Sequence, residues 1–178
     1  KNALFLLETR APALNRLLVK IRAQFKFIDR YRTRRAIDKL VKAQHDHLEL
    51  EIKEYDRWVA AFRQYLAVEP RNLPIFQSFM TCQLELVEAR QPSHSDPHRP
   101  IALCVAKNDL RRLQMVVEHH RQLGVEHFVV LDNDSTDGSR DWLIQQPDID
   151  IYLVRQKFQS LIKYGWINRL IAHYGLNR

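Results

Sequence analysis

The chain of 178 residues is 46% hydrophobic and 28% charged, and its formal net charge is +7. These values are typical of a soluble protein with one ordinary domain, or with a small domain and an appendage. No uninterrupted apolar run approaches the roughly 20 residues of a membrane-spanning helix, and the first residues are charged too early for a signal peptide. Two cysteines are too few for a disulfide framework. We therefore expect a cytoplasmic protein with free thiols, able to lie at a membrane surface.

The first ninety residues contain no glycine and have the pattern of helices. Apolar residues recur at alternating steps of four and three in two stripes, each of which predicts one face of a helix. The stripes are Leu14, Leu18, Ile21, Phe25 and Ile28, and then Leu48, Ile52, Tyr55, Val59, Phe62 and Leu66. Pro70 and Pro74 interrupt the second helix, and IFQSFMTCQLELVEA, residues 75–89, is expected to form a third. Residues 1–89 are therefore predicted to form a helical bundle or hairpin.

A basic cluster lies within this helical region. Residues 20–42 contain nine Lys and Arg side chains and only two acids, Asp29 and Asp38. Such a cluster can bind an anionic membrane surface or a protein partner, and it can equally be a solvated helix face. We do not expect nucleic-acid binding, because the basic run carries no recognised motif for it.

After the helical region the sequence pattern changes. Residues 90–100, RQPSHSDPHRP, are a predicted linker, because their prolines and serines break helices and build no core. Strands are then expected at IALCVA, HFVVLD and IDIYLV, with helices at DLRRLQMVVEHHRQLG, DGSRDWLIQQP and SLIKYGWINRLIAHYG. Strands that alternate with helices in this way predict βαβ units and a parallel sheet. We therefore expect an α/β half-domain over residues 101–178, preceded by an all-α region.

Polar segments follow the first two predicted strands, AKND at residues 106–109 and DNDSTDG at residues 132–138. The carboxyl ends of parallel strands meet at one edge of the sheet, where such folds bind ligands. The two segments are therefore expected on one rim. The acidic loop is not an EF-hand, because positions five, six and twelve counted from Asp132 are Thr136, Asp137 and Leu143.

One interpretation of the acidic loop is a phosphatase site. VVLDNDST matches the haloacid dehalogenase signature, an apolar strand followed by Asp-x-Asp-x-Thr. Asp132 would then be the nucleophile and Asp134 the general acid and base, with magnesium bridging the phosphate. Against it, another strand-like run comes first, and no later acidic pair supplies the remaining magnesium ligands. The phosphatase therefore remains an alternative.

A longer stretch, ALCVAKNDLRRLQMVVEHHRQLGVEHFVVLDNDSTDGSRDWL, resembles the amino-terminal half of a GT-A glycosyltransferase of the family-2-like and family-92-like branch. That branch has a strand, Lys-Asn-Glu, a helix with Leu-Gly-Val, and then Asp-Asn-x-Ser-x-Asp-Gly-Ser. Here Asp109 stands where Glu is usual, and Trp166 and Asn168 match a later Trp-x-Asn element. The resemblance covers residues 100–175 and implies a partial GT-A sheet, which is Rossmann-like.

The resemblance implies a site that binds a nucleotide sugar, formed by Lys107, Asn108, Asp109, Asp132, Asn133 and Asp134. It implies sugar transfer from a UDP-linked donor to a glycan or lipid-linked acceptor, as in polysaccharide biosynthesis. The divalent cation, Mn²⁺ or Mg²⁺, and the catalytic base would be held by residues beyond this chain. We therefore expect no metal ligand here and no activity of this chain alone. A non-catalytic interaction module is the other alternative.

Overall fold

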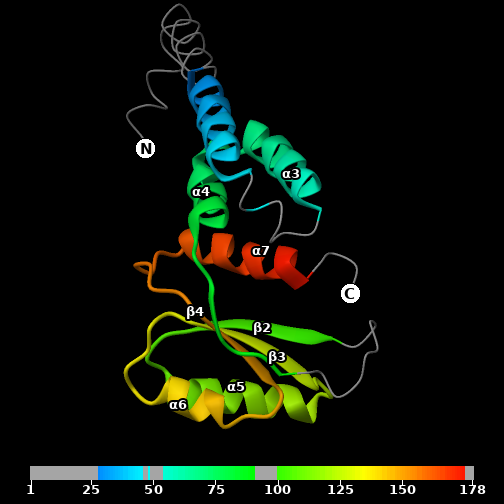
Figure 1. Cartoon of the computed structure of the whole chain (residues 1–178), viewed down its shortest axis with the longest axis vertical. Helices are drawn as coiled ribbons and strands as arrows, with labels where there is room; N and C mark the ends of the chain where they lie inside the picture. Colours follow the sequence, from blue (N-terminus) through cyan, green and yellow to red (C-terminus); the bar gives the residue numbers. More distant parts are fainter. Residues whose placement is uncertain (1–27, 46–47, 49–53, 91–99, 175–178) are drawn as a thin grey trace, which may run out of the picture.

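The computed structural model describes residues 28–45, 48, 54–90 and 100–174. Helices gather at one end of the molecule and an α/β layer structure at the other, with helix α7 (Ile162–Tyr174) between them (Figure 1). Most of the first predicted helix and residues 91–99 of the predicted linker lie outside the described residues. How the helical end packs against the α/β end is therefore described from helix α7, which contacts both.

A four-stranded sheet in the order β1-β4-β3-β2 forms the α/β layer. Strands β2 (Ile101–Ala106), β3 (His127–Asp132) and β4 (Ile149–Leu153) run parallel to one another, as predicted from the alternation of strands and helices. Strand β1 (Glu85–Glu88) pairs antiparallel with β4. The α/β class is confirmed, and the sheet is mixed rather than purely parallel.

Strand β1 also corrects the third predicted helix, which was expected to run to residue 89. Helix α4 (Leu73–Thr81) ends where Cys82 takes an extended conformation, and the chain then enters β1. Glu and Leu favour helix, so the strand at Glu85–Glu88 goes against the local preference of a short segment and is imposed by its pairing. The free backbone groups of β4 decide its conformation, because β1 satisfies them by pairing Leu86 with Tyr152.

Side chains of the sheet are buried on both faces. Phe128 and Val130 belong to a core shared with α5 (Leu110–Gln122) and α6 (Ser139–Ile144). Val129 and Leu131 belong to a second core shared with α7. Since successive strand residues point to opposite faces, an uninterrupted apolar run is what a strand covered on both sides requires.

Helix α7 joins the sheet to the helical end of the molecule. Its Trp166 and Leu170 face the sheet core, whereas Ala172 packs in the core of the helical end. Gly165 allows α7 and α4 to cross closely, because a Cβ there would lie 2.5 Å from the Ser78 Cβ and 2.7 Å from the Phe79 backbone N. The two ends therefore pack as one body through α7.

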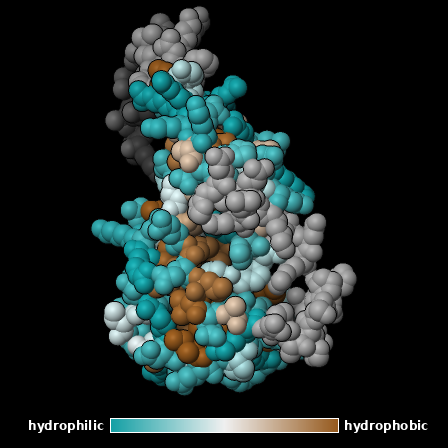
Figure 2. Space-filling view, in the orientation of Figure 1, coloured by the Kyte–Doolittle hydropathy of each residue, from teal (hydrophilic) through white to brown (hydrophobic). Residues whose placement is uncertain are grey.

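The helical end contains residues 28–45, α3 (Tyr55–Val68), the short 3₁₀ helix η1 (Pro70–Asn72) and α4. The predicted stripe on α3 is confirmed, because Tyr55, Val59, Phe62 and Leu66 are all buried. The described part of the basic cluster is exposed: Arg30, Arg32, Arg34, Arg35, Lys39 and Lys42. Figure 2 shows this end as mainly hydrophilic, with apolar surface gathered on the α/β end. None of the described helices is long and apolar enough to cross a membrane.

Candidate functional site

The ends of β2 and β3 form one polar rim. The two strands end side by side, because Ala106 pairs with Asp132 in their parallel register. The Asn133 N–H donates to the Ala106 C=O at 2.8 Å and extends the pairing beyond β3. The Lys107 ammonium group donates to the Asn133 C=O at 2.7 Å. The prediction that both polar segments share one rim is therefore confirmed.

Asn108 fixes the two loops of the rim to each other. Its backbone N–H donates to the Ser135 Oγ at 2.9 Å, and its side-chain Oδ1 accepts from the Thr136 N–H at 2.7 Å. Asn108 and Asp134 have positive φ angles of 47° and 56°. Asn and Asp tolerate this conformation better than other non-glycine residues, and strained residues of this kind gather at functional sites. The rim is thus shaped by its own bonds before any ligand binds.

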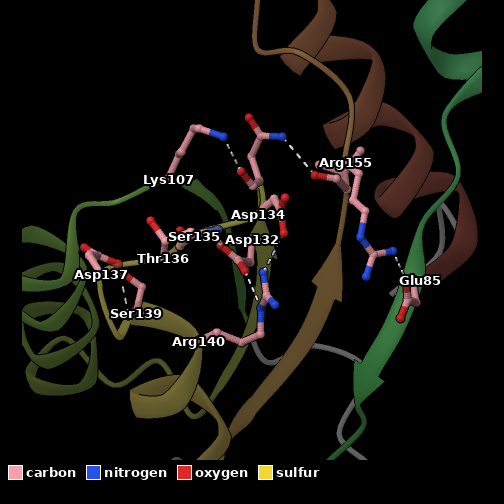
Figure 3. A network of polar contacts seen from close by, with 12 residues as sticks. Glu85, Lys107, Asp132, Asp134, Ser135, Thr136, Asp137, Ser139, Arg140 and Arg155 are labelled. Atoms are coloured by element: carbon pink, nitrogen blue, oxygen red, sulfur yellow. Dashed lines mark hydrogen bonds and ion pairs between the residues drawn. The ribbon is translucent and has the colours of Figure 1, made fainter.

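Asp132 is fully enclosed at the centre of the rim, with 0% of the residue exposed. One carboxylate oxygen accepts from the Ser135 N–H at 3.0 Å, and the other accepts from the Arg140 Nε at 2.7 Å (Figure 3). A buried carboxylate needs such partners, because an uncompensated charge in the interior is costly. Asp132 therefore organises the loop that follows it, and its oxygens face protein rather than solvent.

Arg140 is a rim residue that the sequence analysis missed. Besides Asp132 it contacts the Asp134 Oδ1 through a nitrogen 3.2 Å away (Figure 3). Burial lowers the pKa of Arg140, but the bonds and charges of Asp132 and Asp134 outweigh burial and raise its pKa above the ordinary value. A signal was present in the sequence. A cation in the first turn of a helix faces the positive end of the helix dipole, so it indicates an anionic partner.

Asp137 serves the amino-terminal ends of two helices. Its carboxylate accepts from the N–H of Leu110, where α5 begins, at 2.9 Å and from the N–H of Ser139, where α6 begins, at 3.1 Å. The Ser139 hydroxyl donates to it as well, at 2.5 Å. The bond from this hydroxyl, followed by that from the Leu110 N–H, lowers the pKa of Asp137 below its ordinary value. Asp137 therefore satisfies a backbone N–H at the start of each of these helices.

Three charged groups of the rim reach solvent. Lys107 is exposed, and the side chains of Asp109 and Asp134 are 42% and 52% exposed. Asp109 also forms an ion pair with Arg112 at 3.2 Å. An ammonium group and two carboxylates are therefore held around a rigid frame, and all three are available to a ligand.

Asn133 was expected to contact a ligand, but the residue is buried. Its Nδ2 donates to the backbone carbonyls of Val154 and Gln156, at 2.9 and 2.8 Å. Its Oδ1 is buried and has no hydrogen-bond partner in the part of the chain that the structure describes. The Asn133 side chain therefore attaches the rim to the segment that follows β4.

A second polar network lies at the opposite end of the sheet. Asp150, near the start of β4, accepts from the His127 Nε2 at 3.1 Å, the Tyr174 hydroxyl at 2.5 Å and the Arg90 N–H at 2.6 Å. Burial raises the pKa of Asp150, but these bonds outweigh burial and lower its pKa below the ordinary value. Burial and the bond to Asp150 raise the pKa of Tyr174. No pattern along the chain predicts this network, because its members come from β3, β4, α7 and the residues just after β1.

Comparisons with known proteins do not identify the chain: no family model, no curated protein and no solved structure matches it. Within the described ranges, no group of three or more His, Cys, Asp or Glu side chains could hold a metal ion. Burial raises the pKa of the Cys104 thiol to about 11, so this thiol stays protonated near neutral pH. The geometry of the rim is therefore the basis for inferring a function.

Proposed function

We propose that the chain is the donor-binding part of a GT-A-like glycosyltransferase, and that the rim binds the nucleotide of a nucleotide sugar. The observation that carries this proposal is a preformed rim at the carboxyl ends of β2 and β3, with Lys107 and Asp134 exposed. Ligands of open α/β sheets bind in the crevice outside these strand ends. The locked loops support the proposal, because a rigid site loses less conformational entropy when it binds.

The residues of the rim have separate roles in this proposal. Lys107 uses one donor on the Asn133 C=O, and its other N–H groups are directed to a diphosphate oxygen. Asp109 and Asp134 accept hydrogen bonds from ribose hydroxyls or from the imide N–H of the base. Asp132 is enclosed, so we assign it to holding Arg140 and the loop rather than to contact with the nucleoside.

The complete reaction would transfer a sugar from a UDP-linked donor to a hydroxyl of a glycan or lipid-linked acceptor. A divalent cation, Mn²⁺ or Mg²⁺, would neutralise the leaving diphosphate, and the proposal assigns no residue of this chain to it. We place the protein in the cytoplasm, with the exposed basic helix at residues 28–45 directed to a membrane surface or a protein partner.

The phosphatase alternative has less support from the same geometry. It requires Asp132 as the nucleophile, and a nucleophile needs a carboxylate oxygen that can reach phosphorus in line with the leaving group. Both oxygens of Asp132 accept bonds within the protein, and the residue has no exposed surface. The enclosed carboxylate therefore favours a structural role.

Calorimetric titration of the chain with UDP, ADP and GDP, with and without Mn²⁺, tests the proposal. We expect UDP to bind, and we expect Asp134→Ala to weaken its binding by about tenfold or more, because a hydrogen bond to a charged group is lost. Asp141→Ala is the matched control, since Asp141 is an exposed carboxylate on α6 outside the rim. This control should bind UDP as the unchanged chain does.

Three results of this titration would contradict the proposal. Failure of all three nucleotides to bind would favour an interaction module. Equal losses in Asp134→Ala and Asp141→Ala would show that any binding lies outside the rim. Binding of a phosphate analogue that requires Mg²⁺ would favour the phosphatase instead.

A further inference from the structure

A cavity of about 480 Å³ lies between α3, the start of α4 and α7, and no rim residue lines it. Its volume falls within the range of about 300–1,000 Å³ that small-molecule sites occupy. Aromatic side chains and amides contribute much of its wall: Trp58, Tyr65, Asn72, Tyr164 and Asn168. The cavity is therefore a second candidate site, separate from the nucleotide rim.

The walls of this cavity are held in place by close packing. Trp58 stacks on Phe79 of α4, with ring centroids 5.6 Å apart. The opposite wall belongs to α7, which crosses α4 closely at Gly165 and accepts a hydrogen bond at the Ile162 C=O from the Ser78 Oγ at 3.0 Å. The cavity thus lies between helices that are fixed to one another, and its shape is preformed.

The chemistry of the lining limits the ligand. None of the described residues that line the cavity is charged, so a nucleotide, a phosphate or a free carboxylate would be desolvated without a counter-charge. The Tyr65 hydroxyl accepts from the Asn72 Nδ2 at 2.5 Å, which leaves the second N–H of that amide for another acceptor. An apolar body with a neutral acceptor oxygen suits these walls.

We propose that this cavity binds an uncharged amphiphile, in which a hydrocarbon portion is joined to a neutral head that bears oxygen atoms. The hydrocarbon portion packs against the aromatic wall, as apolar ligand surface does in most small-molecule sites. An oxygen of the head accepts the hydrogen bond from the second N–H of the Asn72 amide. The proposal does not depend on the nucleotide rim, because the two sites share no residue.

Two adjacent alanines of α3 allow a matched test. Ala60 and Ala61 are both exposed, but only Ala61 lines the cavity. The probe is octyl glucoside below its critical micelle concentration, titrated into the intact chain and followed by saturation-transfer NMR. We expect saturable binding that Ala61→Leu weakens by about tenfold or more, since the added side chain occupies the cavity. Ala60→Leu should bind within about twofold of the unchanged chain.

Two further measurements address the chemistry. Asn72→Leu keeps a side chain of similar size but removes the amide N–H groups, and we expect binding about fivefold weaker, the effect of one hydrogen bond. Octyl phosphate has the same chain with a charged head, and we expect it to bind at least about tenfold more weakly than octyl glucoside. Equal binding by Ala61→Leu and Ala60→Leu, absence of saturable binding, or equal binding of the charged probe would each overturn the proposal.

Discussion

Two buried carboxylates lie at opposite ends of the same sheet and have different kinds of partner. Asp132, at the carboxyl end of β3, bonds to Ser135 and Arg140, which lie three and eight residues further along the chain. Asp150, near the start of β4, bonds to Arg90, His127 and Tyr174, which lie 60, 23 and 24 residues away. Both acids are satisfied, but one closes a loop and the other joins separate elements.

The bonds of Asp132 act on the local shape of one loop, whereas those of Asp150 act on the stability of the whole fold. The Asp132 bonds hold a loop of the rim in a conformation that includes the positive φ of Asp134. The Asp150 bonds connect Arg90, just after β1, with the start of β3 and the end of α7, so they constrain segments that are distant in the unfolded chain. We therefore expect changes at Asp150 to alter stability most and changes at the rim to alter binding most.

The largest effect is expected for Asp150→Ala. It leaves His127, which is buried, and the Tyr174 hydroxyl without their shared acceptor, and each buried polar group left unsatisfied costs about 1–3 kcal/mol. Urea unfolding followed by circular dichroism measures it. Asp141→Ala, at an exposed position, should change stability by less than about 0.5 kcal/mol. Similar losses in both variants would show that the Asp150 network does not stabilise the fold.

Arg140→Gln should have the next largest effect. It leaves Asp132 buried without a counter-charge, and we expect a loss of about 2 kcal/mol, because Arg140 is itself partly exposed. Arg112→Gln makes the same change in an exposed ion pair and should cost less than about 0.5 kcal/mol. Amide chemical shifts should change mainly between residues 132 and 140. Shifts spread across the sheet would contradict a local role for Asp132.

A smaller effect is expected from acid. Because the pKa of Asp150 is lower in the folded protein than in the unfolded chain, the folded state favours its charged form. Its contribution is present above the ordinary Asp pKa of about 3.9 and is lost as pH falls through the native value. The free energy of unfolding, measured with urea, should therefore fall less steeply between pH 6 and pH 3 in Asp150→Asn than in the unchanged chain. An equal fall in the free energy of unfolding in both proteins would show that other carboxylates cause the loss of stability in acid.

Asp134→Gly should have the smallest effect on stability and a clear effect on binding. Glycine adopts the positive φ of this position without strain, which offsets the lost contact with Arg140, so stability should stay within about 0.5 kcal/mol. Asp134→Ala keeps the strain and should be about 1 kcal/mol less stable than the glycine variant. UDP titration should show weakened binding in both. Unchanged binding in both would remove Asp134 from the proposed site.

The sequence predicted most of the α/β half because its signals are local and repeated. Strands β2 and β3 lie at the predicted residues, and β4 ends one residue short of its predicted run. The helix signals of α5 and α7 are long enough to be clear. The helix predicted for residues 75–89 was wrong over β1, because four residues of mixed character are assigned by the strand they pair with. Lys107 and Asn108 were placed on the rim correctly, but the enclosure of Asp132 was not foreseen.

The sequence alone determined the strands, the long helices and the meeting of two polar segments on one rim. Periodic burial and the direction of parallel strands are sufficient for these features. Only the tertiary structure decided that Arg140 neutralises Asp132, that Asp150 joins distant elements, and that a cavity lies between α3, α4 and α7. Those features depend on which side chains meet across the fold, and residues that share a contact need not share any pattern along the chain.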